Sequence, residues 1–135
     1  MDGENNHKKI LVVEDENIIA LNIQAILDSF NYNVVGIASN CEDAIDLAIK
    51  HEPNIVLMDI SIIGNRDGVE TAIEIQKIID TSIIFVTAFP EKLTVDRFKN
   101  LKPCGFLSKP FSVESLNTAI KMALFYKVNY GKKEC

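Results

Sequence analysis

The sequence predicts an α/β fold, a doubly wound parallel sheet of five strands with helices on both faces. Short apolar runs alternate with segments of helical periodicity along the 135 residues. Several of the runs are rich in Ile, Val and Leu and show no alternation with polar residues. Both faces of such strands must be covered, as they are in a parallel sheet flanked by helices. Strands that alternate with helices are typical of right-handed βαβ units within one domain.

Five runs are the predicted strands. They lie at Lys9–Val13, Tyr32–Ala38, Asn54–Met58, Ser82–Val86 and Cys104–Leu107. All five are short, and the first, third and fourth are the most uniformly apolar. We therefore expect these three strands to lie in the middle of the sheet, where both faces are covered.

Five segments with apolar residues three or four positions apart are the predicted helices. Their apolar stripes are Ile19–Phe30, Ala44–Ala48, Val69–Ile79, Leu93–Phe98 and Leu116–Val128. Ser39 and Glu42 have the spacing of a capping box at the start of the second helix. Ser112 is a favoured N-cap residue for the last helix. The fourth helix, expected from Pro90 to Asn100, has the weakest stripe.

The last helix allows two interpretations, because its stripe continues past Ala123 and the expected edge of the domain. The continuation is either the frayed end of a helix docked on the sheet, or a partner surface or connecting helix in a longer polypeptide. We assign residues 1–8 to a flexible N-terminal tail and residues 9–127 to a single domain. Residues 128–135 form a C-terminal tail or a helix extension.

Composition narrows the functional classes. The chain is 47% hydrophobic and 24% charged, which is ordinary for a globular protein, and its net charge of −5 argues against a general nucleic-acid binder. The three cysteines are far apart and lack CxxC spacing, which favours a reduced intracellular protein. The polar N-terminal segment lacks the apolar core of a signal peptide, and no run reaches the ~20 apolar residues of a membrane helix. We therefore expect a cytoplasmic location.

Polar side chains follow the ends of the predicted strands. Glu14 and Asp15 follow the first strand, Asp59 the third, Thr87 the fourth and Lys109 the fifth. The carboxyl ends of parallel strands share one edge, and ligands bind at that edge where the winding of the sheet reverses. With the strand order 2-1-3-4-5, this position lies between the first and third strands, which carry the three carboxylates.

The charges at this edge indicate what it binds. Three neighbouring carboxylates repel one another and raise one another's pKa unless positive charge lies among them. Lys109 supplies one positive charge, and an all-oxygen site with open water positions suits Mg²⁺. An aspartate carboxylate can accept a phosphoryl group as an acyl phosphate. A metal ion, Lys109 and the hydroxyl of Thr87 are the groups that would stabilise the added phosphoryl oxygens.

Five motifs resemble, in order, those of the receiver domains of two-component response regulators. They are VVEDE at 12–16, MDI at 58–60, DGVE at 67–70, VTA at 86–88 and GFLSKPF at 105–111. The resemblance extends over residues 9–127. Within the family, the chain is similar to stand-alone, single-domain receivers of the chemotaxis and sporulation type. It implies a flavodoxin-like fold of strand order 2-1-3-4-5 and a role in phosphorelay signalling rather than that of an enzyme.

The resemblance also implies a role for each matching residue. Asp59 would be the phosphoacceptor, assisted by Lys109, which pairs with the phosphoryl group. Thr87 would be the switch hydroxyl, and Phe106 the aromatic residue that moves with it. Mg²⁺, or Mn²⁺ in its place, would be held by Glu14, Asp15, Asp59 and the backbone carbonyl of Ser61. In this family the peptide bond that corresponds to Lys109–Pro110 is cis.

The implied partners are proteins. A sensor histidine kinase or a histidine phosphotransfer protein would donate the phosphoryl group, and the chain would assist its own phosphorylation and dephosphorylation. Phosphorylation would then switch a protein–protein interaction surface on the fourth helix, fifth strand and fifth helix. Direct DNA binding and membrane contact are not expected, and the chain would be a monomer or a phosphorylation-dependent dimer.

Four alternatives compete with a phosphorylated response regulator. The first two are a receiver module of a hybrid sensor kinase and a pseudo-receiver scaffold that is not phosphorylated, against which the intact set of Asp59, Thr87 and Lys109 weighs. An enzyme of the haloacid-dehalogenase type would need a second aspartate where Ser61 stands. A flavodoxin-like redox carrier would need a phosphate-binding loop where the acidic residues 14–16 stand.

Overall fold

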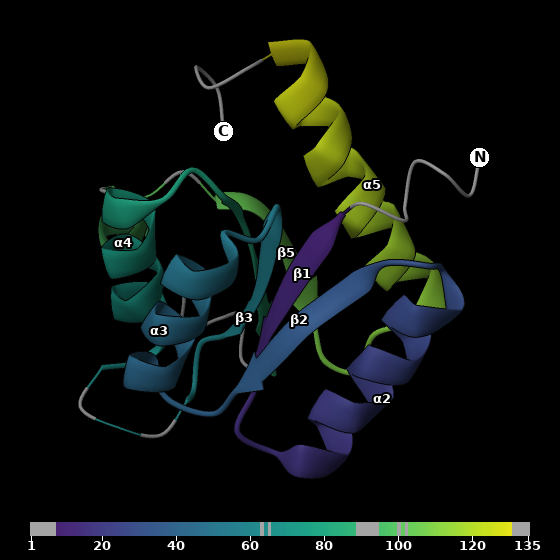
Figure 1. Ribbon diagram of the computed structural model, residues 1–135, viewed down its shortest axis with the longest axis horizontal. Helices are drawn as coiled ribbons and strands as arrows, with labels where there is room; N and C mark the ends of the chain where they lie inside the picture. Colours follow the sequence, from purple (N-terminus) through teal and green to yellow (C-terminus); the bar gives the residue numbers. More distant parts are fainter. Residues whose placement is uncertain are drawn as a thin grey trace.

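The computed structural model describes residues 8–62, 64, 66–88, 95–99, 101 and 103–130. Five parallel strands form one sheet in the order β2-β1-β3-β4-β5 (Figure 1). The strands are β1 (Lys9–Val13), β2 (Asn33–Ala38), β3 (Ile55–Asp59), β4 (Ser82–Thr87) and β5 (Pro103–Ser108). The predicted fold class and strand order are confirmed, and no end of a predicted run differs from the observed strand by more than one residue.

Helices cover both faces of this sheet. The described residues form four α-helices, α2 (Asn17–Ser29), α3 (Cys41–His51), α4 (Gly68–Ile78) and α5 (Val113–Tyr130). Helices α2 and α5 lie against one face and α3 and α4 against the other (Figure 1). The C-terminal turns of α5 extend past the edge of the sheet in the same view. The sheet is therefore doubly wound, as the alternation of apolar runs and helical stripes predicts.

The sheet separates two apolar layers. On one face Leu11 of β1 belongs to a buried cluster that includes Ala72 of α4, and on the other face its neighbour Ile10 belongs to a cluster that includes Leu116 of α5. Successive side chains of a strand point to opposite faces, so a strand covered on both sides needs apolar residues throughout. Every residue of β3 and of β4 is buried, which explains why these runs lack polar alternation.

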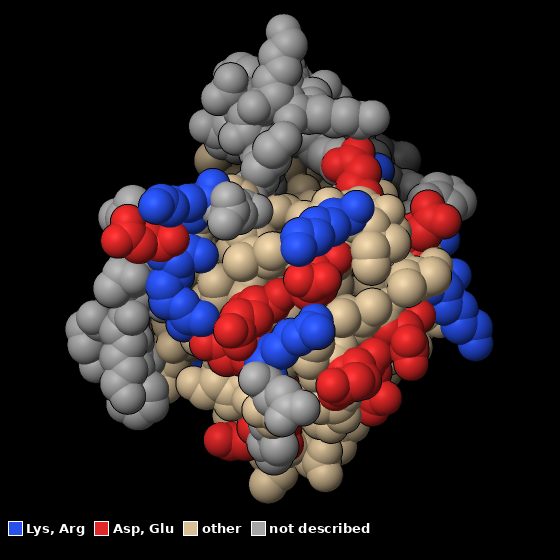
Figure 2. Space-filling view, turned by 90° about the vertical axis from the view of Figure 1, so that its left-hand side faces the viewer, with Lys and Arg blue, Asp and Glu red and all other residues tan. Residues whose placement is uncertain are grey.

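The outer surface of the α3–α4 layer is charged. Figure 2 views this side of the molecule, where acidic and basic side chains are interspersed. Mixed charge of this kind is typical of solvent-exposed helix faces. The functional polar groups lie elsewhere, at the carboxyl edge of the sheet.

The prediction of a capping box formed by Ser39 and Glu42 is wrong. The N-cap of α3 is the next residue, Asn40, whose side chain accepts a hydrogen bond from the backbone N–H of Asp43 at 2.9 Å. Asn40 has the extended backbone that an N-cap requires and is as good a capping residue as serine. The N-cap predicted at Ser112 is confirmed, because its Oγ accepts from the backbone N–H of Ser115 at 3.0 Å.

The segment expected to form the fourth helix contains a 3-10 helix, η2 (Val95–Phe98), instead of an α-helix over its described part. Residues 90–94 and 100 of that prediction lie outside the described residues, as do residues 1–7 and 131–135 of the two predicted tails. Across the described ranges, no helix combines the length and hydropathy needed to cross a membrane.

Candidate functional site

The five polar residues predicted from the strand ends lie at the carboxyl edge of the sheet. Glu14 and Asp15 follow β1, Asp59 ends β3, Thr87 ends β4 and Lys109 follows β5. Strand β1 pairs with both β2 and β3, so the winding reverses between β1 and β3. The two loops that carry the carboxylates are therefore neighbours, as expected.

The three carboxylates converge on one point. Oxygen atoms of Glu14, Asp15 and Asp59 all lie within 4.8 Å of one another. Glu14 and Asp59 are buried, with 2% and 5% of their surface exposed, and Asp15 is half-buried. Oxygen ligands from three acids, one of them open to solvent, suit a hard divalent cation such as Mg²⁺.

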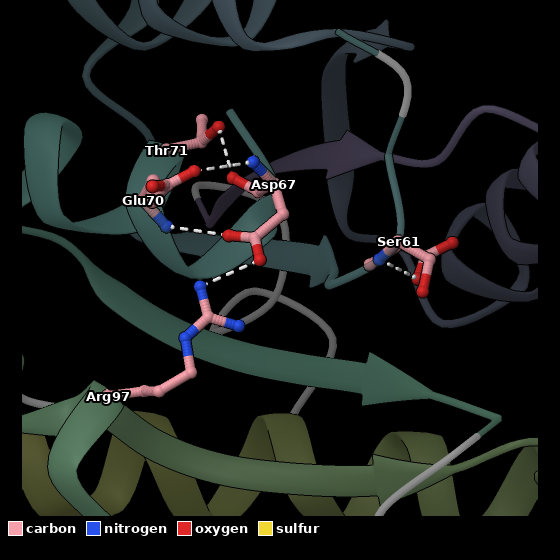
Figure 3. A network of polar contacts seen from close by, with 6 residues as sticks. Ser61, Asp67, Glu70, Thr71 and Arg97 are labelled. Atoms are coloured by element: carbon pink, nitrogen blue, oxygen red, sulfur yellow. Dashed lines mark hydrogen bonds and ion pairs between the residues drawn. The ribbon is translucent and has the colours of Figure 1, made fainter. Parts of the chain in front are cut away.

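Backbone amides of the two loops fix the carboxylates. The N–H of Glu16 donates to Oε2 of Glu14 at 3.1 Å. The N–H of Ser61, labelled in Figure 3, donates to Oδ1 of Asp59 at 3.1 Å. Each acid is thus held by a residue two positions further along its own loop. Ser61 lies in the turn directly after Asp59.

Lys109 bridges the two buried acids. Its Nζ donates to Oε1 of Glu14 at 2.9 Å and to Oδ2 of Asp59 at 3.1 Å. Its backbone N–H donates to the carbonyl oxygen of Thr87 at 2.8 Å, and the Lys109–Pro110 peptide bond is cis. The ammonium group at the end of β5 therefore reaches across β4 to β3 and β1.

The protonation behaviour of the site reflects this crowding. The pKa of the Glu14 carboxyl is raised to about 7, first by burial and then by the negative charge of Asp59, while hydrogen bonds from Lys109 and Glu16 oppose the rise. Burial by itself lowers the pKa of the Lys109 ammonium, but Glu14 and Asp59 outweigh it and the pKa lies above its ordinary value. Lys109 remains charged, but its single positive charge does not balance three carboxylates. A further cation would therefore be favoured at this site.

Strands β4 and β5 carry the two residues predicted to act as a switch. Thr87 is buried at the end of β4, while Phe106 of β5 is 50% exposed. The Phe106 ring stacks on Phe85 with a centroid distance of 5.7 Å and meets Phe98 of η2 edge-to-face at 5.4 Å. Sequence reasoning singled out Phe106 but missed its two partners, although Phe98 belongs to the fourth apolar stripe.

Sequence reasoning also missed an ion pair near the site. Arg97 of η2 contacts Asp67, the N-cap of α4, with 2.7 Å between Nη2 and Oδ2 (Figure 3). Asp67 is part of a capping box with Glu70. The DG pair at 67–68 signals a helix start in the sequence, but no sequence pattern connects it to a residue 30 positions away.

These features coincide with a family match. The family model described as the response regulator receiver domain matches residues 10–121. The chain belongs to this family. Receiver domains are generally signalling domains rather than catalysts, are generally Mg²⁺-dependent, and interact with kinases and downstream proteins.

Curated relatives of this receiver domain are longer regulators. The chain is 30% identical over 128 residues to the phyllosphere-induced regulator PhyR of Methylorubrum extorquens, covering 93% of this chain and 47% of that protein. It is 33% identical over 117 residues to the transcriptional regulatory protein PdtaR of Mycobacterium tuberculosis, covering 87% of this chain and 57% of that protein. The receiver domain thus spans about half the length of the curated relatives it matches.

Solved structures share the fold. The N-terminal domain of a response regulator/sensory box/GGDEF 3-domain protein from Carboxydothermus hydrogenoformans has a TM-score of 0.83 and 35% identity, covering 91% of this chain and 99% of that chain. The anti-anti-sigma factor PhyR from Bartonella quintana has a TM-score of 0.82 and 30% identity, covering 97% of this chain and 53% of that chain. This receiver domain is therefore similar to parts of two different kinds of protein, a 3-domain response regulator/sensory box/GGDEF protein and an anti-anti-sigma factor.

Proposed function

We propose that this receiver domain accepts a phosphoryl group on Asp59 from a sensor histidine kinase or a histidine phosphotransfer protein. The observation that carries the proposal is the contact of the Lys109 ammonium with Oδ2 of Asp59 and Oε1 of Glu14, beside the half-buried Asp15. This arrangement combines a carboxylate nucleophile with a fixed cation and a metal-binding group of acids. It is the combination that phosphoryl transfer to a carboxylate requires.

The proposed transfer is a displacement at phosphorus. A carboxylate oxygen of Asp59 forms the new O–P bond, the N–P bond of the donor phosphohistidine breaks, and the leaving imidazole nitrogen keeps the electron pair and takes up a proton. Lys109 already contacts Asp59, so its ammonium stays close to the phosphoryl oxygens that receive the charge. Thr87, at the end of the neighbouring strand β4, supplies a hydroxyl donor on that side. Attack of water on phosphorus later breaks the O–P bond, releases inorganic phosphate and returns the carboxylate.

A metal ion would be held by Glu14, Asp15, Asp59 and the backbone carbonyl of Ser61. Bound there, Mg²⁺ or Mn²⁺ would offset the repulsion among the acids and stabilise the phosphoryl oxygens during transfer. The convergence of the three carboxylates within 4.8 Å supports this ligand set. The half-buried side chain of Asp15 provides the open side at which water ligands and the phosphoryl donor approach.

The output is proposed to be a change in protein contacts. Phe106 is half exposed on β5 and touches Phe98 of η2, so a change in its position alters the surface formed by η2, β5 and α5. One relative of solved structure, PhyR from Bartonella quintana, is an anti-anti-sigma factor. A protein partner, or a second copy of the chain after phosphorylation, is therefore the proposed reader of this surface. A module of a hybrid kinase would use the same chemistry.

Incubation with acetyl phosphate and Mg²⁺ tests the phosphoacceptor. The wild type is expected to gain one labile phosphate, detected by intact-mass spectrometry and lost on mild base treatment, because acyl phosphates hydrolyse readily. Asp59→Asn should gain none. Asp46→Asn, at an exposed position of α3, should gain the phosphate as the wild type does. A phosphate that persists in Asp59→Asn, or that never forms in the wild type, would refute the proposal.

Mg²⁺ is expected to stabilise the folded chain through the same carboxylates. At a free concentration about 100 times the dissociation constant, binding raises the free energy of unfolding by about 2.7 kcal/mol. Urea unfolding with Mg²⁺ and with EDTA measures the gain. Asp15→Asn, which removes one ligand charge, should lose most of it, whereas Asp46→Asn should keep it. Equal gains in the wild type and in Asp15→Asn would show that the ion binds elsewhere.

A further inference from the structure

The ion pair between Arg97 and Asp67 joins η2 to the start of α4, and residues of both elements pack in the same apolar layer on one face of the sheet. Arg97 belongs to η2, which precedes β5, and Asp67 ends the loop that begins after Asp59 at the end of β3. Nη2 of Arg97 lies 2.7 Å from Oδ2 of Asp67, and the two side chains are 36% and 33% exposed. Figure 3 shows the arginine extending from η2 to the first turn of α4.

Asp67 is a rigid anchor for this pair. Its Oδ1 accepts from the backbone N–H of Glu70 at 3.1 Å, and its own N–H donates to Oε1 of Glu70 at 3.0 Å. Its carbonyl oxygen accepts from Oγ1 of Thr71 at 2.8 Å. The capping bonds occupy one carboxylate oxygen and leave the other, Oδ2, for Arg97 (Figure 3). Because these bonds hold Asp67 in place, a movement of the guanidinium would lengthen the ion pair and leave the position of Asp67 unchanged.

The anchor is in backbone contact with the phosphoacceptor strand. The N–H of Gly68 donates to the carbonyl oxygen of Ile60 at 2.8 Å. The α-carbon of Gly68 approaches the Asp59–Ile60 backbone so closely that a side chain there would overlap it. Gly68, the residue after Asp67, is thus fixed to the backbone of Ile60, the residue after Asp59.

The other end of the connection is aromatic. Phe98 directly follows Arg97 and packs edge-to-face on Phe106 at 5.4 Å and on Phe85 at 5.3 Å. A four-residue 3-10 helix carries both side chains, so an ion pair that holds the backbone of this helix also holds the point from which the Phe98 ring extends. The position of Phe98, in turn, limits the positions open to the Phe106 ring.

We propose that Arg97 is a positioning residue that acts through Asp67 to hold η2, Phe98 and Phe106 in the arrangement adopted before phosphorylation. This inference rests on the proposed function, because it assigns a regulator to the same site. The ion pair is made while the unmodified Asp59 carboxylate is bound by Lys109 and by the backbone N–H of Ser61, and a shift of η2 or of the loop after Asp59 would lengthen it. An interaction that stabilises one of two states biases the equilibrium toward that state, so loss of the pair favours the phosphorylated arrangement.

The test measures the affinity for beryllofluoride with Mg²⁺, a reversible mimic of an aspartyl phosphoryl group. Arg97→Gln is expected to bind it about two- to fivefold more tightly than the wild type, the range that a partly exposed ion pair supports. Removal of a positive charge would by itself weaken the binding of an anion, so the expected direction is opposite to a simple charge effect. Lys99→Gln removes the same charge two residues away, at an exposed position, and should not tighten binding.

A second variant separates the ion pair from helix capping. Asn is as good an N-cap residue as Asp, so Asp67→Asn keeps the capping bonds of α4 and removes only the charge that Arg97 needs. It should tighten beryllofluoride binding as Arg97→Gln does, and the double variant should show no further gain. Additive gains would mean that the two residues act independently, which would overturn the proposal.

A measurement without any phosphoryl mimic distinguishes this inference from the proposed function. Arg97→Gln and Asp67→Asn should shift the NMR ring signals of Phe98 and Phe106, whereas Lys99→Gln should leave them in place. Unchanged ring signals, or an unchanged affinity in Arg97→Gln, would overturn the positioning role. A wild type that binds no beryllofluoride and gains no phosphate would refute the proposed function, while the ring signals would still decide whether Arg97 positions Phe106.

Discussion

Lys109→Met is expected to lower the free energy of unfolding by about 3 kcal/mol at pH 8 in EDTA, measured by urea denaturation. The reason is that the ammonium contacts both buried acids, at 2.9 Å from Glu14 and 3.1 Å from Asp59. Methionine fills a similar volume but leaves two carboxylates that are only 2% and 5% exposed without a counter-charge. Removal of one partner from a buried ion pair costs more than the pair itself contributes.

Two comparisons isolate the electrostatic origin of this loss. The double variant Lys109→Met/Asp59→Asn should recover most of the lost stability, because it also removes one of the two uncompensated charges. Lys77→Met removes a lysine that pairs with Glu74 at 3.2 Å on an exposed face of α4, and should change the stability by about 0.5 kcal/mol or less. Similar losses for Lys109→Met and Lys77→Met would contradict the assignment of a buried, shared cation.

Gly68→Ala is expected to destabilise the fold by about 3 kcal/mol and to slow phosphorylation of Asp59 by acetyl phosphate. A Cβ at this position would lie 2.7 Å from the α-carbon of Ile60 and closer still to the carbonyl oxygen of Asp59. The obstacle is backbone rather than a flexible side chain, so α4 or the end of β3 must shift. Urea unfolding and the rate of mass gain with acetyl phosphate measure the two effects.

The sign of the Gly68→Ala effect is informative, because helix propensity alone predicts the opposite. Alanine inside a helix is favoured over glycine by about 1 kcal/mol. Gly105→Ala in β5 is the matched control, since the nearest atoms to its Cβ are side-chain carbons of Ile84 at 3.8 Å, an ordinary contact. A stabilised Gly68→Ala, or equal losses in the two variants, would show that α4 is not fixed by this close approach.

Strand positions and the meeting of the acids could be predicted because both follow from short-range patterns. Runs without polar alternation identified strands covered on both faces, and the residue after each run marked the carboxyl edge. The charge imbalance among Glu14, Asp15 and Asp59 called for a cation, and Lys109 contacts two of the three. The contacts are observed, whereas the roles of these residues in phosphoryl transfer remain predictions for the experiments above.

Features that depend on a single backbone angle or on distant pairs could not be predicted. Ser39 and Asn40 are adjacent residues of similar capping strength, and only the extended backbone of Asn40 decides which of them caps α3. Arg97 has no sequence signal that selects Asp67 among the acids of the chain. Arg97 pairs with Asp67 because η2 lies beside the start of α4 in the folded chain. That position depends on the packing of the whole domain.

The double attachment of Lys109 has a consequence for how the molecule transmits a signal. The side chain binds the two acids in the middle of the sheet, and the backbone N–H of the same residue binds the carbonyl oxygen of Thr87 at the end of β4. If Asp59 is phosphorylated as proposed, the change in its charge would act through this side chain on the main chain at the end of the edge strand β5, without an intervening helix. Lys109 thus connects the charge of the proposed phosphorylation site to the backbone at the edge of the sheet.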